Sequence, residues 1–149
     1  MDTDERTTGM GLWTDANEML TAAQHIVSVK RLELSQPLYF LLGHSLELSF
    51  KSYIRAKGAP LSCLKSIGHD LLLGLEWAQV TGIGELVQVG EKDIALIQLM
   101  NSYYRAKEFE YRVTGYKNLP RAEDVLALLS KILSATKPFC AKNIRTQHA

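Results

Sequence analysis

Four polar side chains recur at helical spacing within residues 38–55. His44, Glu47, Lys51 and Arg55 follow one another at steps of three, four and four, so on a helix they share one face. An imidazole beside a carboxylate and an ammonium group suits acid–base chemistry or the binding of an anion. Because the rest of this segment is mostly apolar, the stripe is either a solvated helix face or the lining of a cleft.

The His-x-x-Glu spacing of His44 and Glu47 also offers two ligands to a metal ion. A single pair of this kind is a weak signal, and no glycine-rich phosphate loop accompanies it. We therefore expect neither a metal nor a cofactor.

A second set of polar residues is Gly68-His69-Asp70. Gly68 is suited to ending one helix and Asp70 to capping the next, which places His69 at the joint. The alternative is a catalytic His–Asp arrangement. The candidate catalytic residues of the chain are therefore His44 and His69.

A third set lies in the segment 93–112, where polar residues again recur at steps of four, three and four: Asn101, Arg105, Glu108 and Arg112. The aromatic residues among them are Tyr103, Tyr104, Phe109 and Tyr111. Aromatic rings beside arginines can stack on bases and hold phosphates, or they can form the edge of the core. The neighbourhood is only mildly basic. We expect the three sets to converge, with these binding residues: Glu47, Lys51, Asn101, Tyr104 and Arg112.

The elements that would position these residues are all helices. Residues 1–13 are expected to form a flexible tail, and Thr14 or Asp15 to cap a helix that stops near Leu34. Further helices are expected at 35–57, 61–67, 70–82, 93–111 and 118–137, and a second tail at 138–149. No segment alternates at period two as a strand would. The sequence therefore predicts one all-α domain, 14–137, folded as an up-and-down bundle of four to five main helices.

Composition narrows the class of protein. The chain has 149 residues, 46% of them hydrophobic, and 17 basic against 16 acidic residues, for a net charge of +1. Such a balance argues against a protein that is wrapped in nucleic acid, although it permits a local basic patch. Neither a signal peptide nor a membrane span is predicted, and Cys63 and Cys140 form no metal or disulfide pattern. These features predict a cytoplasmic protein.

Taken together, several motifs resemble the HEPN family (higher eukaryotes and prokaryotes nucleotide-binding). They are LGHSLELSFK at 42–51, the stop at Gly58, GHDL at 68–71, LMNSYY at 99–104 and FEYR at 109–112. The resemblance covers about residues 37–133. It implies a bundle of four or five helices that often forms homodimers. Members of the family include RNA-cleaving toxins, defence proteins and partners of small nucleotidyltransferases.

One departure from the family bears on activity. Its ribonuclease members carry an Arg followed, after about four to six residues, by a His on a late helix, whereas Arg105 and Arg112 have no such His. The resemblance therefore implies a homodimeric binding or accessory module that recognises a nucleotide, RNA or a partner protein such as a nucleotidyltransferase. One alternative is a divergent metal-independent ribonuclease. A second alternative is a purely structural interaction module.

Overall fold

The computed structural model describes residues 6–29, 35–109 and 118–143, and within these ranges the chain is helical without a strand. This confirms the all-α class. The elements are α2 (Gly9–Ser28), α3 (Gln36–Ala56), α4 (Leu61–Ile67), α5 (Leu71–Val80), the short 3₁₀-helix η2 (Ile83–Glu85), α6 (Glu91–Tyr104) and α7 (Ala122–Lys142).

Helix α3 is the centre of the fold. It contacts each of the other five α-helices, and 15 of its 21 residues are buried. The predicted start is confirmed, because the Ser35 side chain accepts a hydrogen bond from the Leu38 N–H and Pro37 lies in the first turn. The end is also confirmed, since Lys57 and Gly58 follow the last helical residue and Gly58 has a φ of 103°.

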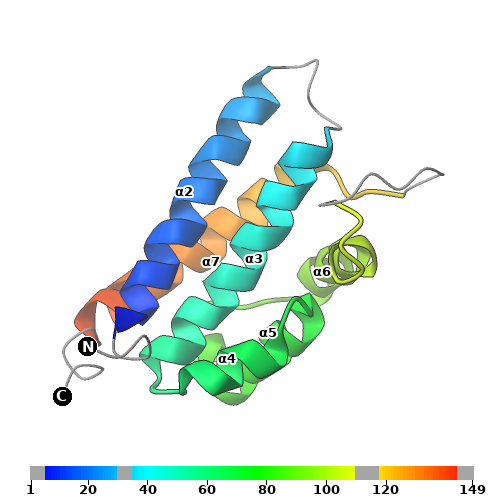
Figure 1. Cartoon of the computed structure of the whole chain (residues 1–149). Helices are drawn as coiled ribbons and strands as arrows, with labels where there is room; N and C mark the ends of the chain where they lie inside the picture. The colour runs from blue at the N-terminus through cyan, green and yellow to red at the C-terminus, as the bar shows by residue number, and fades with distance from the viewer. Residues whose placement is uncertain (1–5, 30–34, 110–117, 144–149) are drawn as a thin grey trace.

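Helices α2 and α7 pack along α3 (Figure 1). Glycine and serine allow the close approach of α2: a Cβ added to Gly9 would lie 2.7 Å from the Ser52 carbonyl oxygen, and the Ser45 hydroxyl donates a 2.8 Å hydrogen bond to the Ala16 carbonyl. Helix α2 is joined to α7 by Trp13, whose Nε1 donates to the Leu133 carbonyl at 2.9 Å. These three helices form the main core of the domain.

The prediction that the first helix begins at Thr14 or Asp15 is wrong, because α2 begins at Gly9. The Thr8 hydroxyl caps it by accepting a hydrogen bond from the Gly11 N–H at 3.0 Å. The buried face includes Trp13, so residues expected in a tail belong to the core. The expected stop near Leu34 lies outside the described residues.

The prediction that Pro138 ends the last helix is also wrong, because α7 continues to Lys142. The turn after Pro138 is anchored by packing. Cys140 is fully buried, and the Phe139 ring lies 5.3 Å from the Tyr53 ring between centroids. Asn143 then donates from Nδ2 to the Phe139 carbonyl at 2.8 Å. These contacts offset the backbone hydrogen bond that proline cannot donate.

Helices α4 and α5 match their predicted positions closely. Gly68 follows α4 with a φ of 60° and a ψ of −133°, a conformation that favours glycine. The Asp70 carboxylate then caps α5 by accepting a hydrogen bond from the Leu73 N–H at 3.1 Å. The joint between the two helices therefore holds His69 on a defined turn.

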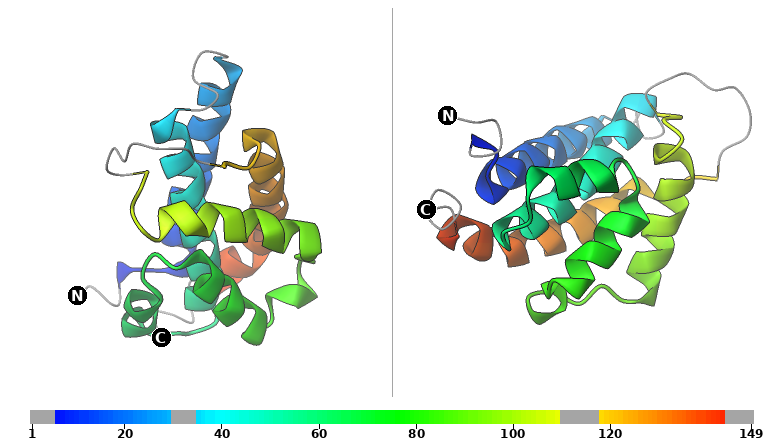
Figure 2. Two further views of the ribbon diagram at one scale, coloured as in Figure 1. Left: turned by 90° about the vertical axis from the view of Figure 1, so that its right-hand side faces the viewer. Right: turned by 60° about the horizontal axis from the view of Figure 1, so that its bottom comes forward.

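Helix α6 crosses the direction of α2 and α3 (Figure 2, left) and packs on α3, α5 and α7. It begins at Glu91 and not at Asp93, whose carboxylate instead accepts a hydrogen bond from the Gly90 N–H at 3.0 Å. It also ends earlier than the predicted Tyr111. After Tyr104 the backbone turns through Lys107, which has a left-handed φ of 60°. No helix among the described residues is both long and apolar enough to cross a membrane.

Candidate functional site

Glu47 is a buried carboxylate that accepts hydrogen bonds from three parts of the fold. Its side chain is only 6% exposed. Lys51 Nζ donates to Oε2 at 3.0 Å, while His69 Nδ1 and the Tyr104 hydroxyl each donate to Oε1 at 2.8 Å. Its donors come from α3, from the joint between α4 and α5, and from α6. We call Glu47, Lys51, His69, Tyr104 and His44 the Glu47 cluster.

His44 joins the cluster through Tyr104. Its Nδ1 lies 2.9 Å from the Tyr104 hydroxyl oxygen and 4.0 Å from Glu47 Oε1. A phenol carries one proton, and that proton lies on the bond to the carboxylate, which can only accept. His44 Nδ1 must therefore donate to Tyr104. The His44 ring is also stacked on Phe40, with 5.7 Å between ring centroids.

The surroundings of Glu47 favour its ionised form. Burial alone would raise the pKa of this carboxyl, but the hydrogen bond from His69, the charge of Lys51 and the hydrogen bond from Tyr104 outweigh burial and lower the pKa. A carboxylate at neutral pH and an ammonium partner 3.0 Å away compensate each other's charge. Glu47 and Lys51 are thus a paired ionic centre inside the bundle.

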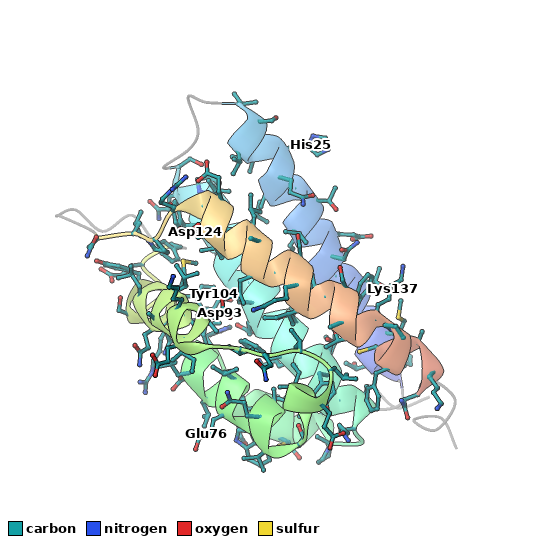
Figure 3. All side chains as sticks on the ribbon, turned by 180° about the vertical axis from the view of Figure 1, so that it is seen from behind. His25, Glu76, Asp93, Tyr104, Asp124 and Lys137 are labelled. Atoms are coloured by element: carbon teal, nitrogen blue, oxygen red, sulfur yellow. The ribbon has the colours of Figure 1, made fainter. Side chains whose placement is uncertain are left out.

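The Tyr104 ring reaches Glu47 because α3 has a glycine at the crossing with α6. A Cβ added to Gly43 would overlap the Tyr104 ring. With hydrogen at that position, the Tyr104 ring packs close to the α3 backbone and its hydroxyl donates to the carboxylate one turn further along. Tyr104 itself is buried, and its position within the bundle is labelled in Figure 3.

A second hydrogen-bonded group lies next to the Glu47 cluster, at the start of α5. Asn101 is buried, and its Oδ1 accepts from the Leu71 N–H at 2.8 Å while its Nδ2 donates to Asp70 Oδ1 at 3.0 Å. Arg105 Nη1 lies 3.7 Å from Asp70 Oδ2. These contacts fix the start of α5, and with it the turn that carries His69, against α6.

The structure brings most of the predicted site residues together. His44, Glu47, Lys51, His69 and Tyr104 form one hydrogen-bonded cluster, so a solvated face is the wrong interpretation for the buried Glu47 and Lys51. Asn101 lies beside the cluster and serves the α5 cap instead of contacting the α3 stripe. The predicted binding residue Arg112 lies outside the described residues.

Arg55 has partners that the helical spacing did not predict, whereas His69 meets Glu47 and Asp70 caps α5 as expected. Arg55 continues the α3 stripe in sequence, but it donates to the carbonyls of Thr7 and Ala59. It therefore ties the segment before α2 and the segment after α3 to the end of α3. His69 hydrogen-bonds to Glu47, while the Asp70 carboxylate accepts from Leu73 and Asn101. The imidazole is therefore paired with a carboxylate distant in sequence and not with its neighbour.

Arg105 is the site residue that the prediction left out. Its side chain is 68% exposed, and its loose ion pair with Asp70 places a cation beside the residue that follows His69. A signal was present in the sequence, because Arg105 follows Asn101 by one helical turn.

A groove of about 500 Å³ lies elsewhere, between α6 and α7. Asp93 and Asp124, labelled in Figure 3, are two of its lining residues. The ammonium of Lys131, also in the lining, forms a 2.7 Å hydrogen bond to Asp93. No group of three or more His, Cys, Asp or Glu side chains in the described parts of the chain is placed to hold a metal ion.

The aromatic residues of α6 and of the turn that follows it are mainly part of the core edge. Tyr104 and Phe109 are buried, and Phe109 packs against Tyr39 with 5.9 Å between ring centroids. The Tyr103 hydroxyl accepts a hydrogen bond from the Asn118 N–H at 2.7 Å. Of the two interpretations of these rings, the core edge is the one that this packing supports.

The resemblance to the HEPN family stays a prediction. No protein-family model matches the chain, and neither a curated protein nor a solved structure matches it.

Proposed function

We propose that this chain is a HEPN-like helical module that binds RNA or a nucleotide at the Glu47 cluster. The observation that carries the proposal is the hydrogen bond from His69 to the buried Glu47, which holds a partly exposed imidazole at the joint between α4 and α5. Arg105 adds an exposed cation next to this joint. Imidazole and guanidinium groups are common contacts of phosphates and bases.

The energetics of the cluster support a role beyond stability. A buried ion pair is often no more stabilising than apolar residues of the same volume, because both charges lose their hydration. If the Glu47–Lys51 pair only filled the core, apolar residues would serve stability at least as well. A paired centre that positions two imidazoles is better explained by what His69 and His44 contact at its rim.

Two variants test the proposal without removing a core side chain. His69→Ala and Arg105→Ala each remove an exposed side chain. We expect each to weaken binding of a fluorescently labelled mixed RNA pool by about threefold to thirtyfold in an anisotropy titration, the range for loss of one hydrogen bond, neutral or charged. His25→Ala and Arg6→Ala are matched controls, because both residues are exposed and lie outside the cluster.

Figure 3 labels His25 on α2, away from Tyr104, so its removal should leave binding unchanged. If His69→Ala and Arg105→Ala bind the pool as tightly as the wild type does, the site is wrong. If the wild-type chain binds no RNA and no nucleotide, the remaining expectation is a partner protein, such as a nucleotidyltransferase.

A second candidate function, RNA cleavage, is favoured by the same Glu47–His69 hydrogen bond. A carboxylate that accepts from one imidazole nitrogen orients the other as a general base, and this arrangement recurs in hydrolytic enzymes. Incubation of the wild type with RNA would then give shorter products on a denaturing gel. Their loss in His69→Ala or His44→Ala, with cleavage retained in His25→Ala, would move this candidate to first place. Intact RNA in every lane would exclude it for that RNA pool.

We also propose that the chain forms a homodimer, on the strength of the family resemblance. Sedimentation equilibrium across a hundredfold range of protein concentration would detect the dimer. A species of one chain mass, 16.7 kDa, at every concentration would contradict it.

A further inference from the structure

The hydrogen bonds around Glu47 determine which nitrogen of His69 carries the proton. An ionised carboxylate can only accept, so the 2.8 Å bond to Oε1 requires a proton on His69 Nδ1. In the neutral imidazole the other nitrogen, Nε2, then has a lone pair and accepts hydrogen bonds. The burial of Glu47 and its ammonium partner make this assignment robust, since both hold the carboxylate in place.

The imidazole that carries this acceptor is partly exposed. The His69 side chain is 42% exposed, and within the described ranges of the chain no hydrogen bond to its Nε2 is present. The T-shaped contact with Tyr104, at 6.1 Å between ring centroids, fixes the plane of the imidazole. A ligand at this point therefore meets an oriented lone pair.

A cation lies beside Asp70, the residue that follows His69. Arg105 Nη1 is 3.7 Å from the Asp70 carboxylate, beyond hydrogen-bond length, so its guanidinium keeps donors for a further anion. An acceptor near a guanidinium complements a hydroxyl near a phosphate. In a nucleic acid that pair of groups occurs in RNA, where each sugar carries a 2′-hydroxyl close to its phosphate, and not in DNA.

We propose that His69 and Arg105 recognise a ribose–phosphate unit, with His69 Nε2 accepting a hydrogen bond from the 2′-hydroxyl and Arg105 donating to the phosphate. This inference rests on the proposed function, because it specifies which feature of the ligand the site contacts. According to this proposal, His69 is the residue that distinguishes RNA from DNA, and Arg105 contributes equally to the binding of RNA and of DNA.

Three oligonucleotides of one sequence, with 2′-hydroxyl, 2′-hydrogen or 2′-fluoro sugars, test the proposal. The fluoro sugar keeps an RNA-like pucker but cannot donate a hydrogen bond. At pH 8, where imidazoles are generally neutral, we expect the hydroxyl form to bind the wild type roughly threefold to tenfold more tightly than either analogue, as for one neutral hydrogen bond. His69→Ala should bind all three alike, at about the affinity of the analogues. Equal binding of the hydroxyl and fluoro forms by the wild type would overturn the proposal.

Two controls separate this inference from the proposed function. Arg105→Ala should weaken all three oligonucleotides by a similar factor and preserve the ratio between them, and His25→Ala should change neither. If none of the three binds to the wild type, both RNA binding by the module and this inference fail. If all three bind alike, the binding module stands and recognition of the sugar fails.

The tautomer of His69 can be measured without a ligand. Nitrogen-15 NMR distinguishes an imidazole protonated at Nδ1 from one protonated at Nε2, and the His69→Ala spectrum assigns the signal. We expect the Nδ1-protonated form at pH 8, although it is the minor form of free histidine in water. A signal from the Nε2-protonated form in the folded wild type would overturn the inference, whatever the binding data show.

Discussion

Glu47 illustrates how one residue can connect helices that are distant in sequence. Its two oxygens accept hydrogen bonds from α3, from the turn before α5 and from α6. Removing the carboxylate would leave the Lys51 charge buried without its partner, and such losses are strongly destabilising. Removing His69 would cost much less, since its ring is partly exposed.

The pH dependence of stability should report on this carboxylate. Because its pKa is lower in the folded chain than in the unfolded chain, Glu47 contributes stability above the pKa of the unfolded carboxyl, and this contribution is lost as pH falls through the folded pKa. We expect Glu47→Gln to lose less stability than the wild type between pH 7 and pH 3, measured by urea unfolding.

Glu76→Gln is the matched control, since Glu76 is exposed and has no ion pair with a described residue. It should keep the wild-type loss of stability on acidification. If Glu47→Gln and Glu76→Gln showed the same loss, Glu47 would not be the group responsible.

The convergence of His44, Glu47 and Lys51 with His69 and Tyr104 could be predicted from sequence, because helical spacing places such residues on one face and a largely apolar helix must pair its charges. The hydrogen-bond partner of each individual atom could not be predicted from sequence. Asn101 hydrogen-bonds to the start of α5, and Arg55 hydrogen-bonds to two backbone carbonyls. These partners depend on how the helices pack against one another, which the spacing of residues in one helix does not reveal.

At the scale of elements, the crossing of α3 and α6 depends on Gly43. Gly43→Ala would push the Tyr104 ring away from Glu47, and crowding of this kind costs about 1–3 kcal/mol. Alanine favours the helix by about 1 kcal/mol, so we expect a net destabilisation of up to about 2 kcal/mol in urea unfolding.

Gly74→Ala is the control within α5. A Cβ there would meet its nearest neighbour, Phe50, at an ordinary 3.5 Å, so this change should leave stability unchanged or raise it. If Gly43→Ala were as stable as Gly74→Ala, α6 would move away from α3 without a loss in the free energy of unfolding, which would contradict this prediction.

The turn that ends α6 contains strain that can be relieved. Lys107 has a φ of 60°. Its N–H donates to the Tyr104 carbonyl, and the N–H of Glu108 donates to the Tyr103 carbonyl. This is the hydrogen-bond pattern of a helix C-terminus that usually has glycine at the position of Lys107. We expect Lys107→Gly to raise the free energy of unfolding by about 0.5–1 kcal/mol. Lys107→Ala removes the same charge but keeps the strain, so equal stability of the two variants would contradict this explanation.

Helix ends marked by a local residue were predictable, and ends set by packing were not. Ser35, Gly58, Gly68 and Asp70 act through their own backbone conformation or side chain, and each lies where the sequence indicated. By contrast, α2 begins before the predicted residue because Trp13 packs into the core. Helix α7 continues beyond Pro138 because Cys140 packs into the core. Tertiary contacts of that kind override local signals.

At the scale of the whole molecule, a net charge of +1 provides little general attraction for nucleic acid. Binding to RNA should therefore come from a few local cations and respond weakly to salt. Each phosphate contact on a single strand contributes about −0.7 to the slope of log affinity against log salt. We expect a wild-type slope of only about −2, and Arg105→Ala to bring it roughly 0.7 closer to zero, measured by anisotropy titrations from 50 to 300 mM salt. A steep slope that Arg105→Ala left unchanged would place the phosphate contacts elsewhere.

The hydrogen bond from Trp13 to Leu133 gives the chain a built-in optical reporter. The chain has two tryptophans. Trp13 is buried beneath the Lys137 ammonium, which lies 5.1 Å from its ring, whereas Trp77 on α5 is partly exposed. Trp77→Phe would leave a single tryptophan whose emission depends on the docking of α2 against α7. Stopped-flow refolding of that variant would time the moment at which segments 120 residues apart in the sequence meet.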